Sequence, residues 1–188
     1  MSRSTRLFLI CHGPTTAARN ATFPHDEPLV DGDIDTIHAF IPPDLLREAY
    51  LVCSPARSTV QIAEAISSSY EVDHRLADLD HGLWSGRSLE DVARSEPEAL
   101  KEWMTEPDFS PPEGESIVHL IQRSQAWLDG NLQRGGKIVA ITHRAVCRAM
   151  IVSALGAPAD AFWKIDIGFP GKTTLTSDGR RWSLSGIE

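Results

Sequence analysis

The chain has few cysteines, no long apolar run and no excess of positive charge. Cys11, Cys53 and Cys147 are too few and too scattered for a disulfide framework or a Cys-x-x-Cys metal site. No apolar run approaches the length of a membrane span, and residues 1–6 lead directly into the first expected strand. We therefore expect a cytoplasmic protein that does not enter a membrane.

The net negative charge of the chain bears on which partners it can bind. A formal net charge of −8 argues against general binding to nucleic acid or to an anionic membrane surface, although it leaves room for a local basic pocket. With 188 residues, of which 41% are hydrophobic, the chain can build a core without disulfides or metal ions. We expect one domain over residues 1–188 and a small-molecule partner, and we leave a homodimer open.

The first informative stretch is the apolar run at residues 7–10, which is followed by Cys11, His12 and Gly13. Consecutive apolar residues without helical spacing indicate a strand that is buried on both faces. Gly13 allows the backbone to turn sharply and to approach a ligand closely. His12 is therefore expected at the carboxyl end of a sheet, where ligands of open α/β folds usually bind.

A second apolar run repeats this arrangement. Residues 137–142 indicate another buried strand, which ends at His143 and is followed by a helix over residues 144–155. One strand-end histidine alone could be a rim residue satisfied by a nearby carbonyl group. Two of them in one parallel sheet can converge on one pocket, and this favours a functional site.

The rest of the pattern alternates strands and helices. Polar loops are expected at 15–33, 75–86 and 107–114, helices at 33–41, 54–67, 88–104 and 115–128, and strands at 50–53, 71–73 and within 162–187, around a turn at 177–179. This order predicts a three-layer α/β/α sandwich with a mainly parallel central sheet and a late antiparallel hairpin. The five tryptophans are expected to pack in the core or at its rim.

Five short motifs occur in an order that resembles a known family. They are Cys11-His12-Gly13, Ser54-Pro55 with Gln61, Ala63, Glu64 and Ala65, the stretch from Asp78 to Gly86, Gly114-Glu115-Ser116, and Thr142-His143. Each motif is weak alone. Together they resemble the histidine phosphatase (phosphoglycerate mutase-like) superfamily over nearly the whole chain, and this resemblance implies the same fold.

The resemblance also implies a chemistry. In that family one histidine attacks phosphorus to form a phosphohistidine, a second histidine and two arginines bind the phosphoryl oxygens, and a carboxylic acid protonates the leaving group. By position, His12 matches the nucleophile, His143 the second histidine and Asp78 the general acid. A neutral imidazole and a carboxylic acid suit these tasks. We expect no cofactor and no metal.

The two family arginines are missing from this chain. Cys11 stands where the first is usual, and an ungapped alignment places Ser58 at the second. Bidentate guanidinium contacts to phosphate are strong and are not easily replaced. Arg19, Arg57 and Arg144 are the candidates that could enter the pocket instead.

Several residues of these motifs are further candidates for the site. A Cys11 thiol beside His12 could have a lowered pKa and act as a nucleophile. A metal set with Asp78 and His143 is disfavoured, because Cys11 and His12 are adjacent on a strand and point to opposite faces. The residues expected to bind substrate are Gly13, Arg19, Arg57, Ser58, His81, Glu115, Ser116 and Arg144.

Three functions remain open at this point. The favoured one is hydrolysis of a small phosphorylated metabolite through a phosphohistidine at His12, with an atypical anion pocket. The second is acid/base or Cys11-assisted chemistry on a less charged molecule. The third is a binding protein without catalysis. Mutase activity is less expected than hydrolysis, because the segment between Trp84 and Glu115 is short.

Overall fold

The computed structural model describes residues 4–30, 37 and 40–188. Its elements in chain order are β1 (Thr5–Cys11), α1 (Thr16–Arg19), α3 (Pro43–Leu46), β2 (Ala49–Cys53), α4 (Arg57–Ile66), β3 (Glu71–Val72), η1 (His74–Leu76), η2 (Gly82–Trp84), α5 (Leu89–Ser95), α6 (Pro97–Thr105), α7 (Ile117–Asn131), β4 (Gly136–Thr142), α8 (Arg144–Leu155), η3 (Ala159–Lys164), β5 (Gly171–Ser177) and β6 (Trp182–Ile187). Most of the helix predicted at 33–41 lies outside the described residues.

The six strands form one sheet in the order β3-β2-β4-β1-β5-β6. The pairs β2·β3, β2·β4 and β1·β4 are parallel, whereas β5 runs antiparallel to both β1 and β6. The predicted mainly parallel sheet with a late antiparallel hairpin is confirmed. In the central pair, Cys11 lies opposite Thr142, so that β1 and β4 end at the same level.

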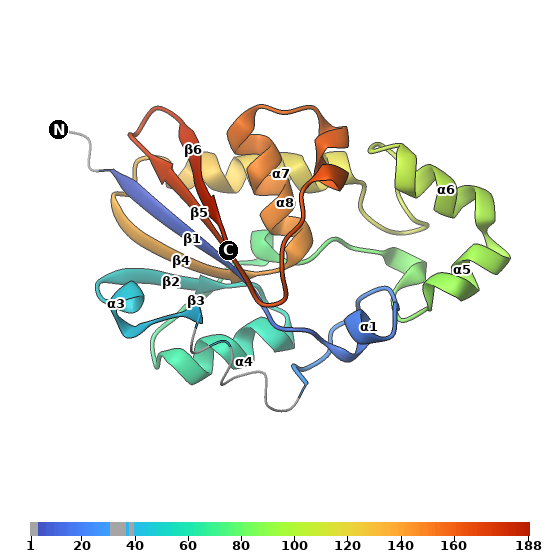
Figure 1. Cartoon of the computed structure of the whole chain (residues 1–188), viewed down its shortest axis with the longest axis horizontal. Helices are drawn as coiled ribbons and strands as arrows, with labels where there is room; N and C mark the ends of the chain where they lie inside the picture. The colour runs from blue at the N-terminus through green and yellow to red at the C-terminus, as the bar shows by residue number, and fades with distance from the viewer. Residues whose placement is uncertain (1–3, 31–36, 38–39) are drawn as a thin grey trace.

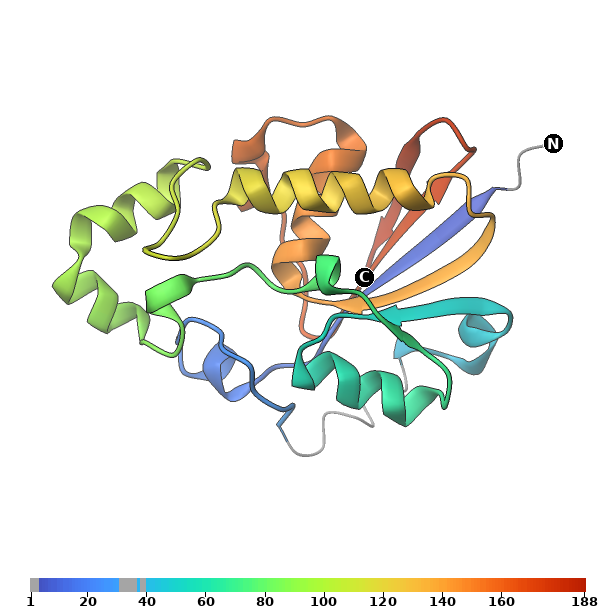
Figure 2. The same ribbon diagram turned by 180° about the vertical axis from the view of Figure 1, so that it is seen from behind.

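Both faces of the sheet are covered by helices. Leu7, Leu9 and Cys11 pack into a core cluster with α7 and α8, whereas Phe8 and Ile10 pack into a second cluster with α4. This alternation follows from the two-residue period of a strand. Figures 1 and 2 show α7 and α8 on one side of the sheet and α4 on the other, which is the predicted three-layer arrangement.

The helices α5 and α6 extend past the carboxyl ends of the parallel strands and form a lateral extension in both views (Figures 1 and 2). A small core of their own holds them, with Phe23, Trp84, Val92 and Leu100 all buried. Ser88 caps α5, because its hydroxyl oxygen accepts the Asp91 N–H at 3.0 Å. The extension therefore lies at the sheet edge where β1 and β4 end.

Two predicted boundaries are wrong, and each has a local cause. The helix predicted from Ser54 begins only at Arg57, since Ser54 and the following Pro55 stay outside it. The strand pattern predicted from Phe162 begins only at Gly171, because residues after Pro158 form the 3₁₀ helix η3. The helix predicted at 144–155 is confirmed as α8. Within the described part of the chain, no helix is long and apolar enough to cross a membrane.

Candidate active site

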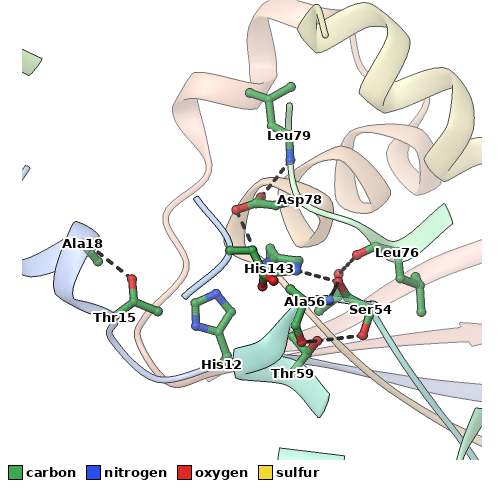
Figure 3. A network of polar contacts seen from close by, with 12 residues as sticks. His12, Thr15, Ala18, Ser54, Ala56, Thr59, Leu76, Asp78, Leu79 and His143 are labelled. Atoms are coloured by element: carbon green, nitrogen blue, oxygen red, sulfur yellow. Dashed lines mark hydrogen bonds and ion pairs between the residues drawn. The ribbon is translucent and has the colours of Figure 1, made fainter. Parts of the chain in front are cut away.

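The register of β1 and β4 brings His12 and His143 together. Each histidine directly follows its strand, and the His12 N–H donates to the Thr142 carbonyl oxygen at 3.2 Å. The two ring centroids lie 5.0 Å apart, with 75° between the ring planes (Figure 3). Main-chain hydrogen bonds of the sheet therefore fix the spacing of this histidine pair, which we define as His12 and His143.

His12 is held in one tautomer by its neighbour. Its Nδ1 lies 2.5 Å from the Gly13 carbonyl oxygen, which can only accept, so Nδ1 carries the proton and Nε2 keeps a lone pair. Burial lowers the pKa of His12, and this outweighs the opposite effects of the Gly13 hydrogen bond and of Asp78. At neutral pH His12 is an uncharged imidazole with a nucleophilic nitrogen.

His143 lies between a hydroxyl group and a carboxylate. Its Nε2 is 2.8 Å from Ser54 Oγ, and its Nδ1 is 3.5 Å from Asp78 Oδ2 (Figure 3). The carboxylate only accepts, so this arrangement favours a proton on Nδ1 and donation from Ser54 to Nε2. Burial lowers the pKa of His143 to about 4, although Asp78 acts in the opposite direction.

The start of α8 adds backbone donors to this region. His143 is the N-cap residue, and its side chain makes no capping hydrogen bond. Arg144 and Ala145, in the first turn of α8, line the same cavity as the histidine pair. N–H groups at the start of a helix of this length favour an anion, so the start of α8 offers the cavity an anion-binding element made of backbone groups alone.

Asp78 is held by a hydrogen-bonded loop. Arg123 donates to the carbonyl oxygens of Arg75 and Asp78, each at 2.8 Å, and it binds the Glu115 carboxylate through two contacts of 2.7 and 2.9 Å. The Leu79 N–H donates to Asp78 Oδ1 at 2.9 Å. Because backbone and side chain are both held, the Asp78 carboxyl group keeps its position beside His143.

A cavity of about 800 Å³ opens above the histidine pair. Its walls come from the loop after β1, the start of α4, the Asp78 loop, the start of α8 and the segment around η3. Two arginines and four carboxylates line it, namely Arg144, Arg148, Asp26, Glu27, Asp78 and Asp80. The cavity therefore carries charges of both signs rather than a purely cationic surface.

A family profile described as "Histidine phosphatase superfamily (branch 1)" matches residues 7–188. The chain belongs to the histidine phosphatase superfamily. The curated relative phosphoserine phosphatase 1 of Hydrogenobacter thermophilus is 28% identical over 137 residues, which cover 68% of this chain and 64% of that protein. The chain thus spans less than two thirds of the length of this relative.

Two solved phosphatase structures share the fold. A mycobacterial glucosyl-3-phosphoglycerate phosphatase in complex with VO3 superposes with a TM-score of 0.81 at 22% identity and covers 96% of both chains. The alpha-ribazole phosphatase from Shigella flexneri gives a TM-score of 0.83 at 20% identity and covers 97% of this chain and 95% of that one. At such identities these likenesses establish the fold alone.

Six of the twelve residues singled out in the sequence line the cavity, and six do not. Those that line it are His12, Ser58, Asp78, His81, His143 and Arg144; those that do not are Cys11, Gly13, Arg19, Arg57, Glu115 and Ser116. Gly13 acts through its carbonyl oxygen on His12. Ser58 is buried and lines the cavity, as expected for the position to which the resemblance assigns a phosphate-binding arginine.

The prediction of a reactive Cys11 thiol is wrong. Cys11 has no exposed surface and packs with Leu9 and Cys147 in the core under α8. Burial raises the pKa of its thiol well above the ordinary value, and the neighbouring Cys147 acts in the same direction. Strand alternation directs Cys11 into the core and His12 into the cavity.

The two arginines expected to swing into the site lie elsewhere. Arg19 and Arg57 are exposed, and neither side chain lines the cavity. Arg57 instead donates its backbone N–H to Asp26 Oδ1 at 2.8 Å. Their predicted role as phosphate ligands is therefore not supported by their positions, because α4 directs Ser58 rather than Arg57 toward the site.

The residues of the Gly-Glu-Ser motif make structural contacts next to the Asp78 loop. Glu115 pairs with Arg123, and Ser116 is the N-cap of α7, where its hydroxyl oxygen accepts the His119 N–H at 3.2 Å. Neither residue lines this cavity, so their positions do not support the predicted substrate binding, and their contacts hold neighbouring segments in place. Among the described residues, no group of three or more His, Cys, Asp or Glu side chains could hold a metal ion.

Arg148 is a cavity residue that was not predicted from the sequence. It follows Arg144 by four residues, so both lie on one face of α8, and both line the cavity. They share Asp166, with Nη2 to Oδ1 distances of 3.1 Å from Arg144 and 3.6 Å from Arg148. The buried Arg148 Nε finds no hydrogen-bond partner among the described residues. The four-residue spacing from His143-Arg144 is the signal that could have identified it.

Proposed function

We propose that this chain is a phosphoric monoester hydrolase that acts on small phosphorylated molecules through a phosphohistidine at His12. One observation carries the proposal: a neutral His12 whose Nδ1 proton is bound by Gly13 and whose Nε2 lone pair remains for an electrophile in the cavity. Membership of the histidine phosphatase superfamily supports the same reaction.

The reaction follows from the positions of three side chains. His12 Nε2 attacks phosphorus, an N–P bond forms, and the bond between phosphorus and the leaving oxygen breaks. In its protonated form Asp78, at the cavity wall beside His143, gives a proton to that oxygen. Water then attacks phosphorus and loses a proton to the Asp78 carboxylate, the N–P bond breaks, and phosphate leaves with His12 and the protonated Asp78 restored.

The anion-binding role needs donors other than the two usual arginines. His143 is neutral and its two ring nitrogens already face Ser54 and Asp78, so the backbone N–H groups at the start of α8, which line the same cavity, are one source of donors. Arg144 and Arg148 line the cavity and carry two positive charges, of which Asp166 balances one. In this proposal the α8 arginine pair, Arg144 and Arg148, stabilises the charge that develops on the phosphoryl oxygens.

Trapping the intermediate tests the proposal. Brief incubation with a ³²P-labelled monoester, followed by alkaline denaturation, is expected to leave acid-labile label on the wild type and none on His12→Ala. His119→Ala is the matched control, because His119 lies on α7 outside this cavity. Vanadate should compete with the substrate. Turnover by His12→Ala at the wild-type rate, or turnover without label, would exclude the phosphohistidine route.

Non-phosphoryl acid/base chemistry is the second candidate, and the carboxylates of the cavity favour it. Asp26, Glu27 and Asp80 line the cavity together with Asp78, and Ser58 supplies no charge where the family has an arginine. Such a site is less costly for a neutral or monoanionic ligand than for a phosphate dianion. Substrate turnover that neither phosphate nor vanadate inhibits would favour this function. Ligand binding without any turnover would favour a pure binding protein.

Other sequence-based predictions stay predictions. These are a single domain over residues 1–188, a cytoplasmic location, a homodimer and the lack of nucleic-acid partners. The family acts on small phosphorylated substrates, which supports a small-molecule partner for this chain.

A further inference from the structure

Five aromatic residues line the cavity, and we define them as the aromatic wall: Phe23, Trp103, Phe162, Trp163 and Phe169. The ring centroids of Phe23 and Trp103 lie 5.5 Å apart, those of Trp103 and Trp163 5.0 Å, and those of Phe162 and Trp163 5.1 Å. At these separations the rings pack edge to face and support one another.

The wall reaches the catalytic end of the cavity. The Phe169 ring centroid lies 5.7 Å from that of His12, and the Phe23 ring lies 5.1 Å from that of His81. A phosphoryl group at His12 would therefore carry its leaving group along these rings. The wall is the surface that the non-phosphoryl part of a substrate meets.

The tryptophans present carbon to this part of the cavity. Trp103 and Trp163 are partly exposed and line the cavity, yet the Nε1 atoms of both are buried and find no hydrogen-bond partner among the described residues. A sugar hydroxyl or an amino-acid carboxylate would find no indole N–H donor here. A flat apolar group would instead replace water against ring carbons.

The charged groups at the cavity also disfavour a second anion on the substrate. Asp26, Glu27 and Asp80 each accept one backbone N–H at 2.8 Å, from Arg57, Ala17 and Gly82 in that order. These backbone contacts hold the three carboxyl groups in place at the cavity. In the proposed function the positive charges of Arg144 and Arg148 act on the phosphoryl group, so a further anionic group would face carboxylates.

The size of the cavity agrees with a bulky leaving group. At about 800 Å³ it falls in the range that encloses most of a drug-sized ligand, well above the need of a phosphorylated three-carbon compound. The geometry points to a leaving-group subsite on the aromatic wall that takes a large, flat, apolar and uncharged alcohol, so that the substrates are monoesters of such alcohols. This inference rests on the proposed function and specifies its substrate class.

Esters with matched leaving groups test the subsite. The wild type should hydrolyse 2-(2-naphthyl)ethyl phosphate with a kcat/KM at least about tenfold above that of ethyl phosphate and of O-phosphoserine, because all three release primary alcohols but only one has a large apolar group. Equal values, or a preference for O-phosphoserine, would overturn the inference. This comparison needs no variant and so does not depend on mutant folding.

Variants of the wall localise the effect. Trp103→Ala should lower kcat/KM for the naphthylethyl ester about tenfold and leave ethyl phosphate within about twofold, while Trp103→Phe keeps most of the preference. Trp182→Phe, in the core away from the cavity, is the control for loss of a tryptophan. An equal loss on both esters in Trp103→Ala would contradict a subsite role, and Trp163→Ala replaces this variant if it does not fold.

A binding measurement separates this inference from the proposed function. 2-(2-Naphthyl)ethylphosphonate has no phosphate ester bond and so cannot be hydrolysed. Calorimetric titration should show that it binds the wild type more tightly than ethylphosphonate does. Trp103→Ala should weaken the binding of the naphthyl compound. If no monoester is hydrolysed and yet this binding is seen, the proposed function fails and the subsite stands. Binding of the two phosphonates with equal affinity would overturn the subsite itself.

Discussion

The histidine pair and the aromatic wall face the same cavity but are built in different ways. His12 and His143 are fixed by main-chain hydrogen bonds of adjacent strands, and their side chains contact Gly13, Ser54 and Asp78. The wall is assembled by ring packing between segments far apart in sequence, and in the described part of the chain neither tryptophan N–H group has a hydrogen-bond partner. The histidine pair is thus rigidly positioned by the sheet, whereas the aromatic wall depends on side-chain packing and can change with few consequences for the sheet.

The largest expected effect concerns the end of the cavity that holds His12, Asp78 and His143, which we call the polar end. Asp78→Asn should lower kcat by about 10³-fold for alkyl phosphates and far less for p-nitrophenyl phosphate, because only a poor leaving group needs the proton. Steady-state kinetics on both esters measure the difference. Asp108→Asn, outside the cavity, serves as control. An equal loss on the two esters would show that Asp78 is not the proton donor.

Burial of His143 predicts a dependence of stability on pH. Its pKa falls from 6.5 in the unfolded chain to about 4 in the fold, so the unfolded state binds more protons between these values. Stability is therefore fully present above pH 6.5 and declines as pH falls toward 4, by about 3 kcal/mol. Urea unfolding of the wild type and of His143→Gln at pH 7, 6, 5 and 4 measures this.

The slope should be much smaller in His143→Gln, because glutamine does not titrate. His119→Gln should keep the slope of the wild type, since His119 lies outside the cavity. Parallel slopes in the wild type and in His143→Gln would show that other groups cause the acid sensitivity. The measurement therefore tests whether His143 is as deeply buried as its contacts with Ser54 and Asp78 indicate.

Both members of the α8 arginine pair line the cavity, and their guanidinium carbons lie over rings of the aromatic wall, 4.5 Å from the Phe169 centroid for Arg144 and 5.7 Å from the Phe162 centroid for Arg148. Arg148→Ala should lower kcat/KM about 10²-fold for all monoesters, since a guanidinium that binds the phosphoryl group acts on every substrate alike. Arg94→Ala on α5, whose exposed side chain pairs with Glu90, should have no effect. A loss confined to naphthylethyl phosphate would instead place Arg148 in the leaving-group subsite.

A smaller effect is expected for the support behind Asp78. Arg123→Lys removes the two-contact pairing with Glu115 and at least one carbonyl contact, so the Asp78 loop should lose its exact placement. We expect kcat for ethyl phosphate to fall about tenfold with KM nearly unchanged, and p-nitrophenyl phosphate to be less affected. A rise in KM alone would point to a general loosening of the cavity.

Periodicity was sufficient to predict the polar end of the site. Apolar runs before His12 and His143 predicted two strands, and their pairing in register brings the rings together. The same two-residue period separates Cys11 from His12, and it argues against the thiol chemistry that was also considered. The three-layer fold was predictable for a similar reason, because each element repeats its own period.

The aromatic wall could not be predicted in this way. Phe23 and Trp103 meet across 80 positions of sequence, and Trp103 and Trp163 across 60, so no local pattern reports the contact. Of the five tryptophans expected in the core or at its rim, these two line the cavity. The prediction of which arginines enter the cavity failed for a simpler reason. Arg57 is next to Ser58 in sequence but does not line the cavity with it. Arg148, four residues after Arg144, lies on the same face of α8 as Arg144 and does line the cavity.

The alternation along β1 also limits how this protein can evolve. A slip of one residue between β1 and β4 would exchange the environments of Cys11 and His12, placing an imidazole in the hydrocarbon interior and a thiol in the open space. The pairing register of β1 with β4 can change only by whole residues. We therefore expect selection against single-residue insertions or deletions within β1. Changes of length are expected to collect in the connections above it, where new specificities can arise.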